Sequence, residues 1–143
     1  MPTLPPELVD LLAAVHRLDG SDLHLRSEGV PKIRVTGELR PVLDEIWSPE
    51  RVSRTVRASM SAAVLAEFEE TWEADFAVTA VGVGRFRVNA FRSRGQDGAV
   101  FRRIGDSAVP LAELGMPEAV HRLSLRPRGL VLVTGPTGSG KST

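Results

Sequence analysis

Nine residues at the C-terminal end of the sequence have the types and spacing of a phosphate-binding loop. The run is Gly135-Pro136-Thr137-Gly138-Ser139-Gly140-Lys141-Ser142-Thr143, and it fits G-x-x-x-x-G-K-[S/T] at every fixed position. The glycines of such a loop let successive backbone N–H groups turn inward and bind an anion. Lys141 is predicted to reach the β- and γ-phosphates, and the Ser142 hydroxyl to ligate Mg2+. The loop therefore predicts a site for ATP with Mg2+, with all nine residues as candidate ligands.

The residues before the loop supply the context that this pattern requires. Leu130 to Val133 form a short apolar run behind Gly129, which predicts a buried strand leading into the loop. Lys32 and Lys141 are the only lysines of the chain, so a lysine at this position by chance is improbable. The alternative is a glycine-rich turn after a strand that binds nothing, and the strand context disfavours it.

Composition limits the classes of protein to be considered. The 143 residues are 42% hydrophobic and 25% charged, with a formal net charge of zero, as in a globular domain without a general attraction to nucleic acid. The absence of cysteine excludes disulfides and thiolate metal sites and fits a cytoplasmic location. The N-terminus lacks the features of a signal peptide, and no apolar run approaches the length of a membrane span.

The elements that must position a site alternate between helical and strand patterns. An amphipathic helix is predicted from about Pro6 to Leu18, followed by strands over residues 21–26, 32–35 and 38–42. Residues 49–70 predict two short helices broken near Met60, the first with Ser48 as its N-cap.

Three more strands are predicted over residues 71–80, 85–94 and 99–104, with hairpin connections at 81–84 and 95–98. Beyond them the pattern predicts helical turns at 111–114 and 117–123, and a domain boundary between residues 105 and 128. The first part is therefore expected to be an α+β module with mostly antiparallel strands.

Two other groups of polar residues invite a functional interpretation and receive a structural one. His24 lies on the polar face of a strand with Asp22, but the three histidines are too scattered in sequence to predict a metal site, so a structural or interfacial role is expected. The acidic residues around Trp72 are expected to form a solvated helix end.

Several stretches, taken in order, resemble the secretion ATPase superfamily and, within it, the type IV pilus retraction ATPases of the PilT type. The likeness covers nearly the whole chain. Its stretches are Ser21 to Leu25, Ile33 to Val35 with Gly37 to Leu39, Gly84 to Phe91 with Arg94-Gly95, and Arg128 to Thr143.

The resemblance implies a domain plan and an activity. Residues 1–106 would form a PAS-like N-terminal domain, 107–127 a linker, and 128–143 the first strand and Walker A loop of a RecA-like ATPase domain. It implies a cytoplasmic homohexamer beneath the inner-membrane platform protein of the pilus machine. ATP hydrolysis there would drive pilus retraction and twitching motility. No nucleic-acid partner is expected.

The resemblance also assigns a role to arginines, because those of the family's N-terminal domain reach the nucleotide and stabilise charge during phosphoryl transfer. Arg85 and Arg87 lie in the matching segment, and Arg102 is a candidate one strand further on. Strand alternation places Arg85 and Arg87 on the same face, which suits a shared phosphate. The alternative is an ordinary solvated face of an antiparallel sheet.

The motifs that complete phosphoryl transfer are expected after residue 143, since the family places its metal-binding and water-positioning carboxylates beyond the Walker A helix. The 143 residues by themselves are therefore expected to be inactive as an ATPase. A pilus-extension or type II secretion ATPase remains a near alternative, although a short N-terminal region favours retraction. A RecA-like nucleic-acid translocase and a non-catalytic oligomerisation module are alternatives of other classes.

Overall fold

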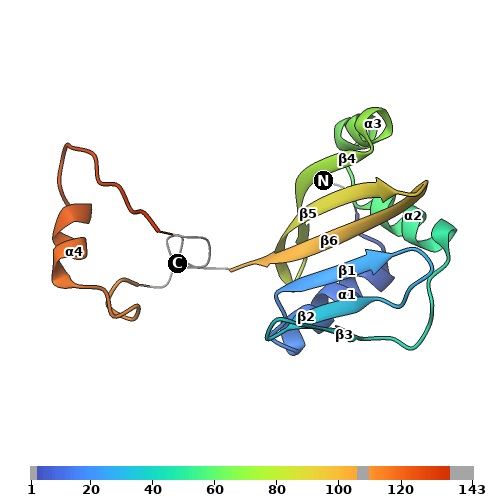
Figure 1. Cartoon of the computed structure of the whole chain (residues 1–143), viewed down its shortest axis with the longest axis horizontal. Coiled ribbons are helices and arrows are strands. Elements are labelled where there is room, and N and C mark those ends of the chain that lie inside the picture. Colours follow the sequence, from blue (N-terminus) through green and yellow to red (C-terminus); the bar gives the residue numbers. More distant parts are fainter. Residues whose placement is uncertain (1–2, 106–109, 136–143) are drawn as a thin grey trace. The chain divides into compact units, whose positions relative to one another are not determined.

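The computed structural model describes residues 3–105 and 110–135, and the chain divides into two compact units, Met1–Ile104 and Gly105–Thr143. The first unit contains three helices and six strands (Figure 1). In chain order they are α1 (Pro6–Arg17), β1 (Asp22–Arg26), β2 (Lys32–Val35), β3 (Glu38–Pro41), α2 (Pro49–Ala58), α3 (Ala62–Thr71), β4 (Glu73–Ala80), β5 (Gly84–Ser93) and β6 (Gln96–Ile104).

The six strands form one antiparallel sheet in the order β3-β2-β1-β6-β5-β4. The first three strands and the last three are each joined by short connections. β1 then pairs with β6, so residues about 80 positions apart in sequence lie opposite one another, with Asp22 facing Arg102. The predicted α+β, PAS-like class with an antiparallel sheet is confirmed.

One face of the sheet carries the hydrophobic core, and in Figure 1 α1 and α2 lie behind the sheet on that side. The strands alternate strictly in this region, as β5 shows with Phe86, Val88 and Ala90 buried between exposed Arg85, Arg87 and Asn89. From the helices, apolar side chains such as Leu8, Leu12, Val15, Val52 and Val56 complete the core, each with no exposed surface. The opposite face of the sheet is consequently left to polar side chains.

The helix starts follow the expected chemistry. α2 begins after Ser48, whose hydroxyl accepts a hydrogen bond from the backbone N–H of Arg51 at 3.3 Å, with Pro49 in the first turn. α3 begins in the same way after Ser61, and the predicted break between the two helices is confirmed. α3 ends at Thr71, and Trp72 then adopts a left-handed backbone conformation with φ of 62°. The fourth strand therefore begins at Glu73 and not at Thr71.

The predicted connection over residues 95–98 is wrong in its extent. The turn is confined to Arg94 and Gly95, both at positive φ, and β6 begins at Gln96. Gln96 and Asp97 pair with Ser93 and Arg92 of β5, so both belong to the ladder. Asp97 has the polarity of a turn residue, but its carboxylate is satisfied by side chains from helix α2 and strand β5, which a local pattern does not reveal.

In the second unit, the described residues contain one helix, α4 (Glu118–Ser124), and hydrogen-bonded turns around 111–115. Residues 129–135 form no strand, so the strand predicted over Leu130 to Val133 is wrong for this chain. These four side chains are exposed, between 54% and 82%. The physical reason is that a strand needs a neighbour for its backbone hydrogen bonds, and the described part of this unit offers none.

Candidate arginine site on the open sheet face

The nine residues of the predicted phosphate loop lie almost entirely outside the described part of the chain. Gly135 is the last described residue, and positions 136–143 are not described, so the ligand roles of Lys141 and Ser142 stay predictions. The site that the structure does describe is formed by the three candidate arginines on the sheet.

Arg85, Arg87 and Arg102, named here the arginine face, project from β5 and β6 on the side of the sheet opposite the core. Arg87 and Arg102 are directly opposite each other in the β5–β6 ladder, while Arg85 is opposite Ile104. Side chains opposite each other in an antiparallel pair lie within about 5.5 Å at Cβ. The predicted common face of Arg85 and Arg87 is confirmed, and the fold adds Arg102 beside Arg87.

Like charges directly opposite each other in a sheet are destabilising unless carboxylates balance them. Asp22 on β1 provides one such carboxylate: the Nε–H of Arg102 donates to Asp22 Oδ1 at 2.8 Å. The Ser21 hydroxyl donates to Oδ2 of the same group at 2.7 Å, and Arg34 Nε lies 3.6 Å from it. The Asp22 side chain is only 4% exposed, whereas that of Arg102 is 70% exposed.

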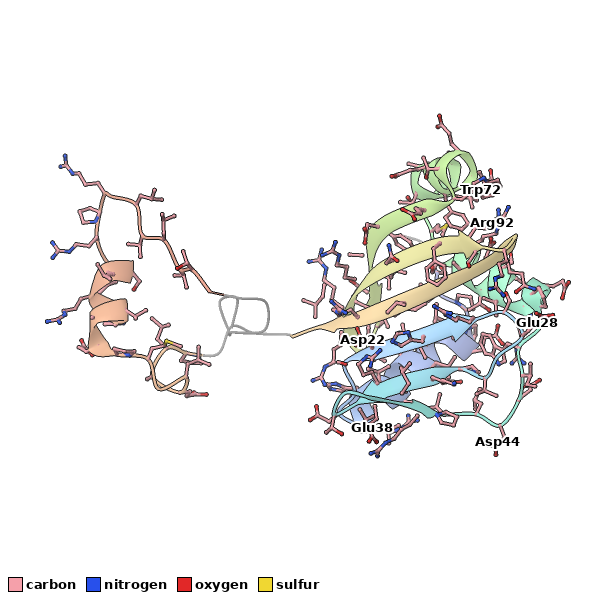
Figure 2. All side chains as sticks on the ribbon, in the orientation of Figure 1. Asp22, Glu28, Glu38, Asp44, Trp72 and Arg92 are labelled. Atoms are coloured by element: carbon pink, nitrogen blue, oxygen red, sulfur yellow. The ribbon has the colours of Figure 1, made fainter. Side chains whose placement is uncertain are left out.

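The buried Asp22 carboxylate is held in its ionised form. Burial raises its pKa, but the hydrogen bonds from Arg102 and Ser21 and the positive charge of Arg102 lower it by more, so the net shift is downward. Asp22 is therefore a fixed negative charge beneath the exposed arginines. It is labelled on the sheet in Figure 2.

Arg87 has a weaker partner. Its Nε lies 3.5 Å from Asp75 Oδ1 on β4, and the side chains are 69% and 55% exposed. An exposed pair at this distance contributes little, about 0.5 kcal/mol, and leaves the arginine free to move. Arg102 and Arg87 thus differ, since Arg102 is hydrogen-bonded to the buried carboxylate of Asp22 and Arg87 has only an exposed partner.

His24 lies two residues along β1 from Asp22 and borders the same surface depression as Arg87, Asn89 and Arg102. Its Nε2 atom is buried and has no hydrogen-bond partner among the described residues. Burial lowers the pKa of His24, and the positive charge of Arg34 lowers it further, so the imidazole is neutral near pH 7. Across the described ranges, 3–105 and 110–135, no group of acidic or histidine side chains could hold a metal ion.

Sequence reasoning missed a second charged cluster, on the core side of the sheet. The carboxylate of Asp97 accepts hydrogen bonds from Arg57 Nε at 2.9 Å, Arg92 Nε at 2.7 Å and the Ser53 hydroxyl at 2.8 Å. Arg92 also stacks on Trp72, with 3.7 Å between the guanidinium carbon and the ring centroid. Both residues are labelled in Figure 2. The cluster fastens α2 to the β5–β6 hairpin and is structural in character.

The acidic residues around Trp72 are in part tied into this cluster. Glu69 pairs with Arg57 at 2.8 Å, while Glu70 and Glu73 are exposed at the end of α3 and the start of β4.

Within the described residues no helix is both long and apolar enough to cross a membrane.

The chain is similar in sequence to a known protein family and to several characterised proteins. The family model described as "Type II/IV secretion system protein" matches residues 6–143. The "Type IV pilus retractation ATPase PilT" of Pseudomonas aeruginosa is 44% identical over 96% of this chain and 40% of its own length. The "Type IV pilus ATPase PilU" of the same organism is 41% identical over 96% of this chain and 36% of its own length.

A solved structure shows the same fold. The chain matches "Crystal Structure of the Pilus Retraction Motor PilT and Bound ADP" with a TM-score of 0.88 and 34% identity, over 95% of this chain and 40% of that one. The chain thus spans about two fifths of the length of these relatives. A family model that matches residues 6–143 and relatives above 40% identity agree, and the chain belongs to the Type II/IV secretion system protein family.

Proposed function

We propose that this chain forms part of a type IV pilus motor ATPase, in which ATP hydrolysis drives pilus retraction and twitching motility. The observation that carries the proposal is the complete phosphate-loop sequence at residues 135–143, at the end of a stretch that matches the family throughout. The ATPase and retraction activities stated in the names of the relatives support it. The domain division at 1–106, 107–127 and 128–143 is part of the same proposal.

The ligands of the proposed reaction are ATP and Mg2+, with the loop Gly135–Thr143 around the phosphates and Ser142 on the metal. The arginine face would supply positive charge for the phosphoryl group as it is transferred, and the exposure of Arg87 and Arg102 supports this role. A homohexamer at the cytoplasmic side of the inner membrane, docked on the pilus platform protein, would convert hydrolysis into movement.

The lysine of the loop provides the first test, in the intact protein that contains these residues. Lys141→Ala is expected to lower steady-state ATP hydrolysis at least about 100-fold, because the ammonium group that neutralises the β- and γ-phosphates is lost. Lys32→Ala is the matched control, since Lys32 is the only other lysine and is exposed on β2. Equal hydrolysis by both variants would contradict the proposal.

The 143-residue chain alone is expected to show no hydrolysis above its own Lys141→Ala variant. Steady turnover by this chain would show that the catalytic carboxylates are already within it, contrary to the proposed plan.

A motility assay separates retraction from the alternative functions. Deletion of the gene in its piliated host is expected to abolish twitching while pili remain on the cell surface, since extension continues without retraction. Loss of surface pili would instead favour an extension ATPase, and loss of protein secretion with normal pili a type II secretion ATPase.

A further inference from the structure

The guanidinium group of Arg102 is occupied along one edge only. Its Nε–H donates to Asp22, and within the described residues the side chain of Arg102 makes no other hydrogen bond or ion pair. The side chain is 70% exposed, and its two terminal NH2 groups have no protein partner among the described residues. A guanidinium fixed in this way presents the pair of donors that matches two oxygens of a phosphate group.

The anchor of Arg102 is rigid for reasons of topology. β1 is an interior strand that pairs with β2 on one side and β6 on the other, and Asp22 is opposite Arg34 in one ladder and Arg102 in the other. Its carboxylate is buried and receives a further hydrogen bond from Ser21. Because β1 is paired on both sides, the position of the Asp22 carboxylate is fixed by the sheet. The hydrogen bond to this carboxylate therefore sets the direction of the Arg102 side chain.

Arg87, the neighbouring arginine, has no such buried partner. Arg87 is equally exposed and lies next to Arg102, but its carboxylate partner Asp75 is exposed and 3.5 Å away. A simple need for charge balance on the open face would be met by surface carboxylates of this kind. A buried and multiply hydrogen-bonded carboxylate opposite Arg102 indicates a need for direction as well as charge.

We propose that Asp22 is a positioning residue for Arg102: it fixes the guanidinium so that its terminal N–H groups face a phosphate of the bound nucleotide. This inference rests on the proposed ATPase function and deepens it. It also changes the ranking of the three candidate arginines. The sequence favours Arg85 and Arg87 over Arg102, whereas in the structure Arg102 is the best oriented of the three.

The proposal distinguishes two roles that Asp22 could have. A purely structural carboxylate would stabilise the sheet whether or not Arg102 is present. A positioning carboxylate acts on catalysis only through Arg102, so its removal has no further effect on turnover once Arg102 is gone.

The test is a double-mutant cycle on kcat and KM for ATP in the intact protein. Arg102→Ala is expected to lower kcat by about 1,000-fold, in the range for a lost arginine finger. Asp22→Asn, which keeps the shape but loses the charge, is expected to lower kcat by about tenfold with KM nearly unchanged. In the Arg102→Ala background, Asp22→Asn is expected to change kcat by less than about twofold.

The matched control is Asp19→Asn. Asp19 pairs with Arg103, the next residue on β6, at 3.2 Å, and is 98% exposed, so the same chemical change beside an adjacent arginine should leave kcat unaltered. If Asp22→Asn fails to fold, the wild-type 143-residue chain still provides a test by NMR. A slowly exchanging Nε–H signal of Arg102, unlike that of Arg87, is expected, and a rapidly exchanging one would overturn the proposal.

The outcomes of these measurements distinguish a failure of the proposed ATPase function from a failure of the positioning role of Asp22. Full hydrolysis by Lys141→Ala overturns the proposed function itself. Loss of hydrolysis in Lys141→Ala with normal kcat in Arg102→Ala removes the arginine role and Asp22 with it. Two results would overturn the positioning role of Asp22 and leave the proposed function intact. One is a lowered kcat in Arg102→Ala with a normal kcat in Asp22→Asn. The other is a loss of kcat on Asp22→Asn that persists in the Arg102→Ala background.

Discussion

At the scale of single residues, the chain places two carboxylates on opposite faces of one sheet and uses them differently. Asp97 faces the helices and ties α2 to β5 and β6 through Arg57, Arg92 and Ser53. Asp22 faces outward and holds one exposed arginine. Burial raises the pKa of both carboxyls, and hydrogen bonds from their partners lower it by more, so both remain ionised at neutral pH.

Removal of the Asp97 carboxylate is expected to destabilise the folded protein. Asp97→Ala leaves Arg57 and Arg92, each 26% exposed, without their shared acceptor, and should lower the free energy of unfolding by about 3 kcal/mol. Asp75→Ala is the comparison, since its partner is exposed, and should cost less than about 1 kcal/mol. Urea unfolding followed by tryptophan fluorescence measures both, and equal midpoints for the two variants would refute the structural role of Asp97.

At the scale of elements, the close packing between α1 and the sheet depends on a glycine. Gly20 follows α1 and precedes β1, and its lack of a side chain looks at first like an ordinary helix stop. A Cβ at this position would fall against Ile33 Cγ2 and lie 3.1 Å from the carbonyl oxygen of Arg34, both on β2. The glycine therefore sets how closely the helix end approaches the second strand.

Gly20→Ala is expected to destabilise the protein by about 1–3 kcal/mol, because Ile33 or the backbone of β2 must shift. Gly29→Ala is the matched control: its Cβ would meet Arg26 O at 3.5 Å, an ordinary contact, and its cost should be small. Thermal unfolding of the two variants checks this. A Gly20→Ala variant as stable as Gly29→Ala would mean that β2 yields without strain.

At the scale of the whole molecule, the ionisable groups with shifted pKa values predict how stability depends on pH. His24 has a lowered pKa, so its contribution is complete above the value of an unfolded histidine, near 6.5, and is lost as pH falls through the folded value. Asp22, Asp97 and Glu7 also have lowered pKa values, and their contributions are lost only as pH falls below about 4.

The free energy of unfolding is therefore expected to fall in two stages on acidification, a small one beginning near pH 6.5 and a larger one below about pH 4. His24→Gln should remove the first stage, and Asp97→Asn should reduce the steepness of the second. Urea unfolding between pH 3 and 8 measures both. A stability that rises as pH falls from 7 to 5 would contradict the neutral state assigned to His24.

Much of the fold follows from local patterns. The alternation in β5 places Arg85 and Arg87 on the polar face without any structure, because successive side chains of a strand point to opposite sides. Ser48 with Pro49 marks the start of α2 for an equally local reason. The phosphate loop at residues 135–143 is likewise a prediction from local sequence, since the pattern consists of glycines and one lysine at fixed spacing, and positions 136–143 lie outside the described residues.

Only the tertiary structure decides what faces what across the sheet. Arg102 joins Arg87 and meets Asp22 because β6 inserts between β1 and β5, a pairing of residues 80 positions apart that no local pattern encodes. Asp97 has the character of a turn residue and becomes a buried acceptor because α2 brings Ser53 and Arg57 to it. Conversely, Leu130 to Val133 have the pattern of a strand but form none, since a strand exists only with a partner for its backbone. The sequence by itself predicted a phosphate loop at residues 135–143 and placed two arginines on one face of a strand. The tertiary structure decided which arginine is held, because its anchor comes from the other end of the domain.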